Sequence, residues 1–304
     1  MIIQRMTTAL NGVAPLANLG VIAVAGEDAA NFLQNQLTND VSLLGMDEAR
    51  LAAWCSAKGR MLASFIAFKQ PGGDILLVTS RDTLPQVLKR LSMFVLRAKA
   101  KLRDATAEFE LYGVAGDAQA KSPWHLRRDG DTAFVSLYPA DGVARSLAVV
   151  PAGSAKPEGA ALDPVQWAWT EVRSGIATIT APIVEAFVPQ MLNYESVGGV
   201  NFKKGCYPGQ EVVARSQFRG TLKRRAYLAH SEGEMAPGQE LFPASDREQP
   251  CGIVAQAAKS PDGGWDAIVS IQLASVNDSA MTVGSADGAS VQLSPPPYPL
   301  LADV

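Results

Sequence analysis

A short basic run in the last third of the chain carries the residues best suited to chemistry. Residues 203–211 read KKGCYPGQE, which places Cys206 between Gly205 and Gly209 with two lysines before it. Glycines let a backbone approach a ligand closely, and Pro208 favours the start of a helix directly afterwards. Helix starts and neighbouring ammonium groups are surroundings in which cysteines become reactive. We therefore predict that Cys206 is a reactive thiol on the working surface.

The other residues of this run are predicted to position and tune that thiol. They are Lys203, Lys204, Gly205, Tyr207, Gly209, Gln210, Glu211 and Arg215. The basic side chains are also suited to pairing with carboxylates of a ligand, the alternative being ordinary surface charge. Glu211 serves more simply by stabilising the first helical turn.

The remaining cysteines argue against a metal centre or a disulfide framework. Cys55 and Cys251 lie in apolar runs and are predicted to be buried. No pair of cysteines has metal-ligand spacing, and three cysteines cannot complete a four-cysteine iron–sulfur site. We predict no resident metal, and the isolated His125 and His230 do not support a Cys-His nucleophile.

A helix predicted over 164–174 carries a second informative residue, Trp167. Asp163 is its expected N-cap, Pro164 its first residue, and Gly175 follows its end. Helical spacing predicts one core face, formed by Val165, Ala168, Trp169 and Val172. Trp167 falls on the opposite face, with Thr170, Glu171 and Ser174. Either a neighbouring domain or a flat aromatic ligand would cover it.

Composition and charge bound the class of protein. A chain of 304 residues with 47% hydrophobic and 19% charged residues predicts two or three globular domains. Residues 81–103 and 203–225 each carry seven basic residues and one acidic residue, whereas 231–304 carries ten acidic and two basic. The basic stretches favour an anionic ligand or partner, but the net charge of −3 argues against general nucleic-acid coating. We expect a soluble, cytoplasmic protein without a membrane segment.

The pattern of apolar residues predicts an α+β chain with antiparallel strands and a C-terminal β-barrel. Strands are expected at 18–25, 50–56, 61–69, 75–79, 98–103, 107–114, 132–138 and 145–150. Helices are expected from 28, over 82–96 and over 209–218, with a linker at 152–162. Barrel strands are expected at 222–230, 250–258, 266–273 and 290–293.

Several segments together resemble the YgfZ-type folate-binding proteins. The most specific is KKGCYPGQEVVAR at 203–215. Weaker matches follow in the expected order: Gly26 with FLQNQLTND at 32–40, AKGR at 57–60, FVLRAK at 94–99 and FVPQ at 187–190. The matches span most of residues 18–225.

The resemblance implies the three-domain ring of the glycine-cleavage T-protein. Residues 1–45 plus 160–220 would form a split folate-binding domain, 46–159 an α+β insert and 221–304 the barrel. It implies tetrahydrofolate or a one-carbon derivative as cofactor. Trp167 matches a tryptophan that the family uses against the folate, and Leu19 stands where the family has a second. The T-protein carries a glutamate near its folate, and Glu171 and Arg173 look exchanged here, so that Arg173 is expected to face the pterin.

We therefore expect an accessory protein that binds tetrahydrofolate and supports assembly or repair of iron–sulfur enzymes, including enzymes that modify tRNA. Trp167, Arg173 and Leu19 are the expected folate contacts, and Cys206 is the expected thiol. Expected partners are iron–sulfur client proteins, with weak tRNA contact through the basic stretches. The alternative is a folate-dependent one-carbon transferase, which the apparent exchange of Glu171 and Arg173 disfavours.

Overall fold

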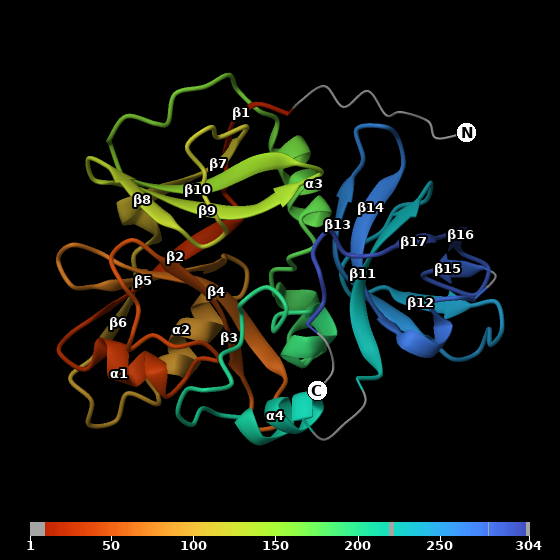
Figure 1. Cartoon of the computed structure of the whole chain (residues 1–304), viewed down its shortest axis with the longest axis horizontal. Helices are drawn as coiled ribbons and strands as arrows, with labels where there is room; N and C mark the ends of the chain where they lie inside the picture. The colour runs from red at the N-terminus through yellow and green to blue at the C-terminus, as the bar shows by residue number, and fades with distance from the viewer. Residues whose placement is uncertain (1–9, 219–221, 279, 302–304) are drawn as a thin grey trace.

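A computed structural model describes residues 10–218, 222–278 and 280–301. Its strands form three antiparallel sheets, two stacked on one side and a barrel-like sheet on the other (Figure 1). The predicted α+β architecture with a C-terminal barrel is confirmed. Among the described helices, none is long and apolar enough to cross a membrane.

The first sheet has five strands. In spatial order they are β1 (Gly12–Pro15), β7 (Phe109–Ala115), β10 (Val143–Pro151), β9 (Thr132–Ala140) and β8 (Leu126–Asp129). Sequence patterning did not predict β1 or β8, because both are four-residue edge strands without a clear apolar alternation.

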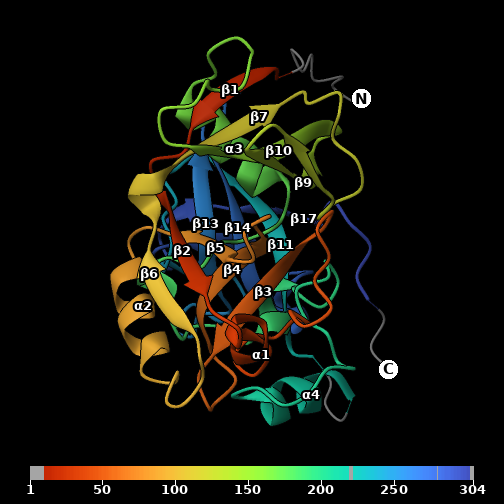
Figure 2. The ribbon, with the colours of Figure 1, turned by 90° about the vertical axis from the view of Figure 1, so that its left-hand side faces the viewer.

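The second sheet lies below the first in Figure 1 and carries two helices on its outer face (Figures 1 and 2). Its strands in spatial order are β3 (Ala49–Cys55), β4 (Met61–Lys69), β5 (Ile75–Ser80), β2 (Leu19–Ala25) and β6 (Lys101–Asp104). The helices are α1 (Ala29–Gln34) and α2 (Leu84–Ser92). Apolar residues of this sheet pack against both helices on one face and against the first sheet on the other.

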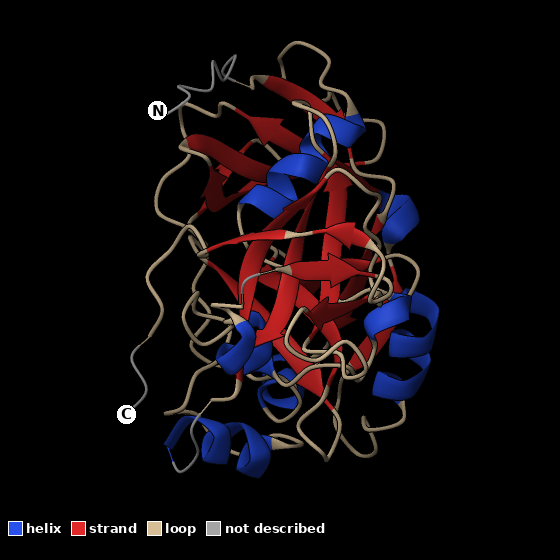
Figure 3. Ribbon diagram, turned by 90° about the vertical axis from the view of Figure 1, so that its right-hand side faces the viewer, coloured by secondary structure: helices blue, strands red, loops and turns tan. Residues whose placement is uncertain are grey.

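The third sheet curves into the barrel seen in Figure 3. Its order is β16 (Ala289–Ser290), β15 (Met281–Val283), β12 (Glu240–Pro243), β13 (Gly252–Lys259), β14 (Trp265–Gln272), β11 (Arg224–Ser231) and β17 (Gln292–Ser294). The long strands β11, β13 and β14 correspond to predicted strands, whereas β12 and β15 were not predicted. These strands all follow the predicted boundary at residue 221, which itself lies outside the described residues.

Strands from different predicted domains pair within the same sheet, so the sheets do not coincide with the predicted domains. Strand β2, from the predicted split domain 1–45 plus 160–220, pairs with β5 and β6 of the predicted insert 46–159. Strand β1 pairs with β7, also from the insert. The backbone hydrogen bonds of an antiparallel sheet join distant segments irrespective of their order in the chain. The domain boundaries themselves stay a prediction.

Helix α3 (Pro164–Arg173) is wedged between the first sheet and the barrel (Figure 1). The Asp163 side chain accepts a hydrogen bond from the Val165 amide at 2.8 Å, which confirms the predicted N-cap. On the barrel side, the Trp169 indole donates to Asp266 Oδ2 at 2.6 Å.

Trp167 and Thr170, predicted on the polar face, are 1% and 0% exposed. Val165, predicted in the core, is 50% exposed. A helix buried on two sides does not follow the one-faced pattern.

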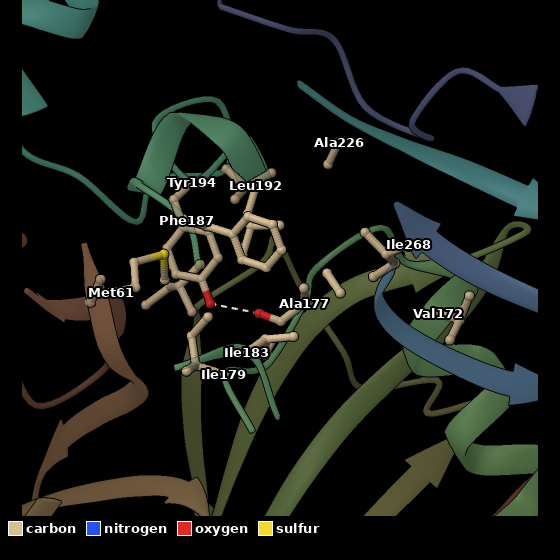
Figure 4. Packing of buried hydrophobic residues seen from close by; sticks show 14 of the residues in the cluster. Met61, Val172, Ala177, Ile179, Ile183, Phe187, Leu192, Tyr194, Ala226 and Ile268 are labelled. Carbon is tan, nitrogen blue, oxygen red and sulfur yellow. Dashed lines mark hydrogen bonds between the residues drawn. The ribbon is translucent and has the colours of Figure 1, made fainter. Parts of the chain in front are cut away.

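The remaining chain fills the centre between the second sheet and the barrel. After α3 it runs through two short 3-10 turns, Ala181–Ile183 and Pro189–Leu192, to α4 (Gln210–Phe218). Figure 4 shows the apolar cluster that this segment forms, with Phe187 and Tyr194 at its middle. The Tyr194 hydroxyl donates to the Ala177 carbonyl at 2.6 Å. This buried hydroxyl is therefore satisfied within the segment.

Gly113 of β7 packs very closely against the indole ring of Trp167. A Cβ atom at Gly113 would lie 2.3 Å from two indole carbons. We expect Gly113→Ala to lower the free energy of unfolding in urea by about 1–3 kcal/mol, because a rigid ring in a packed layer cannot withdraw. Gly72→Ala is the control, since nothing lies within 4 Å of its added Cβ. Equal stability of both variants would show that the Trp167 layer is loosely packed.

Candidate functional site

A cavity lies between the first sheet, the second sheet and α3. About 70 Å³ of its volume is open to water-sized molecules. Its walls are mainly apolar, with Leu51 and Phe65 from the second sheet and Leu137 and Leu147 from the first. Apolar walls with a few polar groups are typical of small-molecule sites. This cavity is therefore taken as the candidate binding site.

Two opposite charges lie in this apolar setting. Arg145 of β10 and Glu171 of α3 both line the cavity. Arg145 is 2% exposed, and its Nη1 donates to the Tyr138 carbonyl at 3.3 Å, while its Nε has no hydrogen-bond partner among the described residues. The Glu171 carboxylate lies close enough to favour the charged guanidinium. The pair thus offers both a donor and an acceptor to a ligand.

Burial shifts the pKa of both members of the pair. Desolvation raises the pKa of Glu171 above its usual value, although the Arg145 charge and the nearby Trp167 indole oppose this. Desolvation lowers the pKa of Arg145 to about 10, and the carboxylate partly restores it. Arg145 therefore stays charged at neutral pH. Unsatisfied charge in a low-dielectric site is costly, so these groups favour a ligand that pairs with them.

The indole of Trp167 lines the cavity but exposes little of itself. Its ring rests on Gly113, and the Arg145 guanidinium carbon lies 4.5 Å from the ring centroid. Its Nε1 is buried and makes no well-formed hydrogen bond to any described residue, although it lies near Glu171. Of the two explanations left open for this tryptophan, the neighbouring sheet covers it. The N–H group is the polar feature that remains for a ligand.

The structure differs from the sequence prediction at Arg173. Arg173 is not among the residues that line the cavity. Its Nε and Nη2 donate to the two carboxylate oxygens of Asp141 at 2.8 and 2.9 Å. Glu171 lies in the cavity instead, two positions earlier on the helix, because successive positions rotate by about 100°. Leu19 does line the cavity, and with Leu16 it also borders an outer groove.

Four residues of this site escaped the sequence analysis as site residues: Arg145, Glu171, Trp124 and Tyr138. An arginine within the apolar strand 143–151 was an available signal, since such a residue is rarely buried without a partner. Trp124 and Tyr138 belong to a loop and to β9, and no local pattern brings them to α3. The pairing of β9 with β10 places Tyr138 beside Arg145, and the Trp124 amide is bound to the Ser136 carbonyl of β9.

Cys206 lies at another end of the molecule, in the loop before α4. It is exposed, whereas Cys55 and Cys251 are 1% and 2% exposed, as predicted. The adjacent Lys204 is buried and donates from Nζ to the Gln34 carbonyl and to the Leu37 carbonyl at 2.7 Å. Burial lowers the pKa of Lys204 to about 8, while Asp40 and Cys206 oppose this shift. Lys204 thus anchors the thiol loop to the end of α1.

The glycines and polar residues of the loop have distinct places. Gly209 has a φ of +79°, and a Cβ there would lie 2.4 Å from the Ser56 carbonyl, so the loop docks on the β3–β4 turn. A Cβ at Gly205 would meet nothing within 4 Å. Arg215 pairs with Glu211 at 2.7 Å on the exposed face of α4. Tyr207 is buried below the Lys204 ammonium, Gln210 is half-buried, and Lys203 is exposed.

Trp167 and Cys206 are therefore not brought together. Figures 1 and 2 place α3 and α4 at opposite ends of the molecule. Cys206 does not line the cavity that holds Trp167. The expectation that both groups share one enclosed space is wrong, because the Cys206 loop packs on α1 and the β3–β4 turn rather than on α3.

One basic residue from each stretch, Arg90 and Lys204, lies near the thiol end of the molecule. In Figure 2, α2 and α4 flank α1 there. The Arg90 guanidinium of α2 lies 5.7 Å from the centroid of the Trp54 ring. Trp54 forms an isolated antiparallel β-bridge with Leu37. Lys204 Nζ donates a hydrogen bond to the Leu37 carbonyl. Arg225 is instead buried against Glu195, and Arg219 lies outside the described residues. Contact with tRNA at this end stays a prediction.

Comparison with known proteins places this fold in a definite class. Residues 5–122 match the family described as the GCVT N-terminal domain. The aminomethyltransferase T of the glycine cleavage system from Bartonella henselae superposes with a TM-score of 0.62 at 14% identity, covering 96% of this chain and 87% of that one. The chain therefore has the fold of the glycine-cleavage T-protein.

Sequence relatives narrow the class further. The tRNA-modifying protein YgfZ of Cronobacter sakazakii is 31% identical over 269 residues, which cover 82% of this chain and 80% of that protein. The protein of the same name from Sodalis glossinidius is 30% identical and covers 93% and 92% respectively. The chain belongs to the YgfZ family.

Proposed function

We propose that this protein binds a tetrahydrofolate in the cavity and acts as an accessory factor for iron–sulfur enzymes, including enzymes of tRNA modification. The observation that carries the first part is that Arg145 and Glu171, which carry opposite charges, line the same apolar cavity. The YgfZ name of its relatives, tRNA-modifying protein, supports the second part.

The polar groups of the cavity match the chemistry of a reduced pterin. Arg145 Nε and Trp167 Nε1 are buried donors without partners among the described residues. They suit the carbonyl and ring nitrogens of a pterin, whereas the Glu171 carboxylate suits its amino and N–H groups. Apolar side chains, Leu19 included, would cover the flat ring. The residues present therefore fit the group, and bound folate would supply a carrier for one-carbon units.

Cys206 is the residue assigned to the accessory role. Its thiol is exposed in a loop fixed at both ends, by Lys204 on one side and Gly209 on the other. A thiol held outward by a rigid loop is accessible to another protein, whereas the buried Cys55 and Cys251 are not. One cysteine cannot complete a cluster, so Cys206 would act together with the ligands of a client.

Folate binding is expected to change tryptophan fluorescence through the cavity. Tetrahydrofolate should quench the wild-type protein, and Trp167→Phe should lose a large share of that response, because the indole lies beside Arg145 and Glu171. Trp265→Phe removes a half-buried tryptophan of the barrel and is the matched control. If the two variants are quenched equally, the folate does not bind beside Trp167.

Loss of the Cys206 thiol is expected to abolish the accessory role without unfolding the protein. In a deletion strain, Cys206→Ala should fail to restore the activity of iron–sulfur enzymes, while Cys251→Ala should restore it. Thiol titration of the native protein verifies the variants, since one cysteine should react rapidly and that reaction should vanish in Cys206→Ala. Full rescue by Cys206→Ala would reject the role.

Transfer of a one-carbon unit is the second candidate function, and the position of Glu171 favours it. The sequence argument against this reaction placed Arg173 beside the pterin, but the structure places a carboxylate in the cavity. A carboxylate with a raised pKa is suited to general acid–base work or to stabilising positive charge.

This candidate predicts turnover of a methylated or aminomethylated donor in the presence of tetrahydrofolate. Glu171→Gln should then lower the rate by about a hundredfold, the usual scale for a lost acid–base group. Arg173→Gln is the control, because that guanidinium pairs with Asp141 outside the cavity. A wild-type protein that binds folate but consumes no donor would exclude the reaction.

A further inference from the structure

The loop that follows α2 presents large apolar side chains to solvent. Met93 is 70% exposed, Phe94 44% and Leu96 89%. Apolar residues exposed singly are ordinary, but a group of them on one segment marks an interaction site. We call these three residues the apolar patch. They overlap the segment FVLRAK at 94–99, to which neither the cavity nor the thiol gives a role.

The loop is fixed in place, so its exposed side chains are held outward. Val95 and Ala98 pack against the apolar core of the second sheet, and the Ala98 amide donates to the Val95 carbonyl at 2.8 Å. The Lys99 amide donates to Asp28 Oδ2 at 2.7 Å. Between these anchors Leu96 has a φ of +45°, which is uncommon for a residue other than glycine. Strained residues of this kind cluster at functional sites.

Basic residues flank the apolar patch in the sequence. Lys89, Arg90 and Arg97 are exposed, and none of them forms an ion pair with a described residue. We call these three the basic rim. By contrast, Lys99 Nζ pairs with Glu27 at 2.8 Å. Unpaired cations beside an apolar centre speed the encounter with an acidic surface and disfavour a basic one.

The residue types of this surface favour a protein partner over a nucleic acid. Protein interfaces have an apolar centre in which aromatic residues, Met and Arg are enriched, with a polar rim around it. RNA is bound by cations at its phosphates and by flat groups that stack on its bases. The aliphatic side chain of Leu96 and the thioether of Met93, the two most exposed members of the apolar patch, serve neither purpose.

The apolar patch lies at the same end of the molecule as the Cys206 loop, since α2 and α4 flank α1 there (Figure 2). The end of β3 supports both. Phe94 packs against Trp54 with ring centroids 6.2 Å apart, and a Cβ at Gly209 would lie 2.4 Å from the Ser56 carbonyl. An ordinary protein interface covers about 800 Å² of each partner, roughly 20–30 residues. A single bound protein of that footprint can contact the patch and the thiol loop together.

We infer that the apolar patch and its basic rim form the docking surface for the iron–sulfur client protein. The client is expected to present an apolar projection surrounded by acidic side chains. This inference rests on the proposed function, because it states where the client binds. The exposed Cys206 thiol offers little surface of its own, whereas the patch supplies apolar area and the rim supplies charge.

The test is rescue of iron–sulfur enzyme activity in a deletion strain by variants of the full chain. Leu96→Glu places a charge of the client's own sign in the apolar patch. We expect it to lower the rescued activity to about a tenth, because the loss of one buried leucine alone weakens binding about tenfold. Val165→Glu is the matched control, since Val165 is 50% exposed on α3 at the opposite end, and it should rescue fully. Arg97→Glu should also lower the rescue, while Arg97→Lys should keep most of it.

Urea unfolding of the purified variants checks that they are folded, and Met93→Glu carries the same expectation if Leu96→Glu does not fold. Full rescue by Leu96→Glu overturns the docking surface, while loss of rescue in Cys206→Ala would leave the proposed function standing. Full rescue by Leu96→Ala, together with loss of tRNA binding in purified Arg97→Glu, would assign the surface to a nucleic acid and also overturn the inference. A wild-type protein that does not rescue overturns both.

Discussion

The interaction on which the site depends is the approach of two opposite charges, Arg145 and Glu171, inside an apolar cavity. Each charge alone would be costly there, and their attraction offsets only part of the desolvation. The raised pKa of Glu171 and the lowered pKa of Arg145 both express that remaining cost. A ligand that brings its own donors and acceptors relieves this cost, which favours a polar ligand over an apolar one.

The close approach of α3 to the first sheet makes this pair possible. Glu171 reaches the cavity because Trp167, one turn earlier, lies flat on the backbone at Gly113. Any larger residue at 113 would lift the helix and move the carboxylate away from β10. The barrel holds α3 from the other side through the Trp169–Asp266 hydrogen bond. The contacts that hold α3 in the fold therefore also place Glu171 in the cavity.

The secondary structure was largely predictable, because it follows local signals. Asp163, Pro164 and Gly175 fix the limits of α3, and apolar runs between turn residues identify β4, β5 and β10. The cavity was not predictable, because Arg145, Glu171 and Trp124 meet only through the packing of two sheets on a helix. Arg173, expected at the pterin, does not line the cavity, because the face of α3 that meets the cavity depends on its two neighbours. The motif around Cys206 was visible, but nothing local reveals that its loop packs on α1.

Although the thiol and the cavity are separate, the β3–β4 hairpin contacts both, and the segment that begins at Tyr194 in the cavity wall leads directly to the Cys206 loop. Leu51 and Ser64 of this hairpin line the cavity, and its turn at Ser56–Gly59 packs on Gly209 beside the thiol loop. A Cβ at Gly59 would in turn lie 2.9 Å from Val212 of α4. A ligand that orders the cavity walls therefore acts on strands that directly support the Cys206 loop. If folate influences the thiol, the hairpin and the segment from Tyr194 to Cys206 are the two connections through which it would act, since Cys206 does not line the cavity.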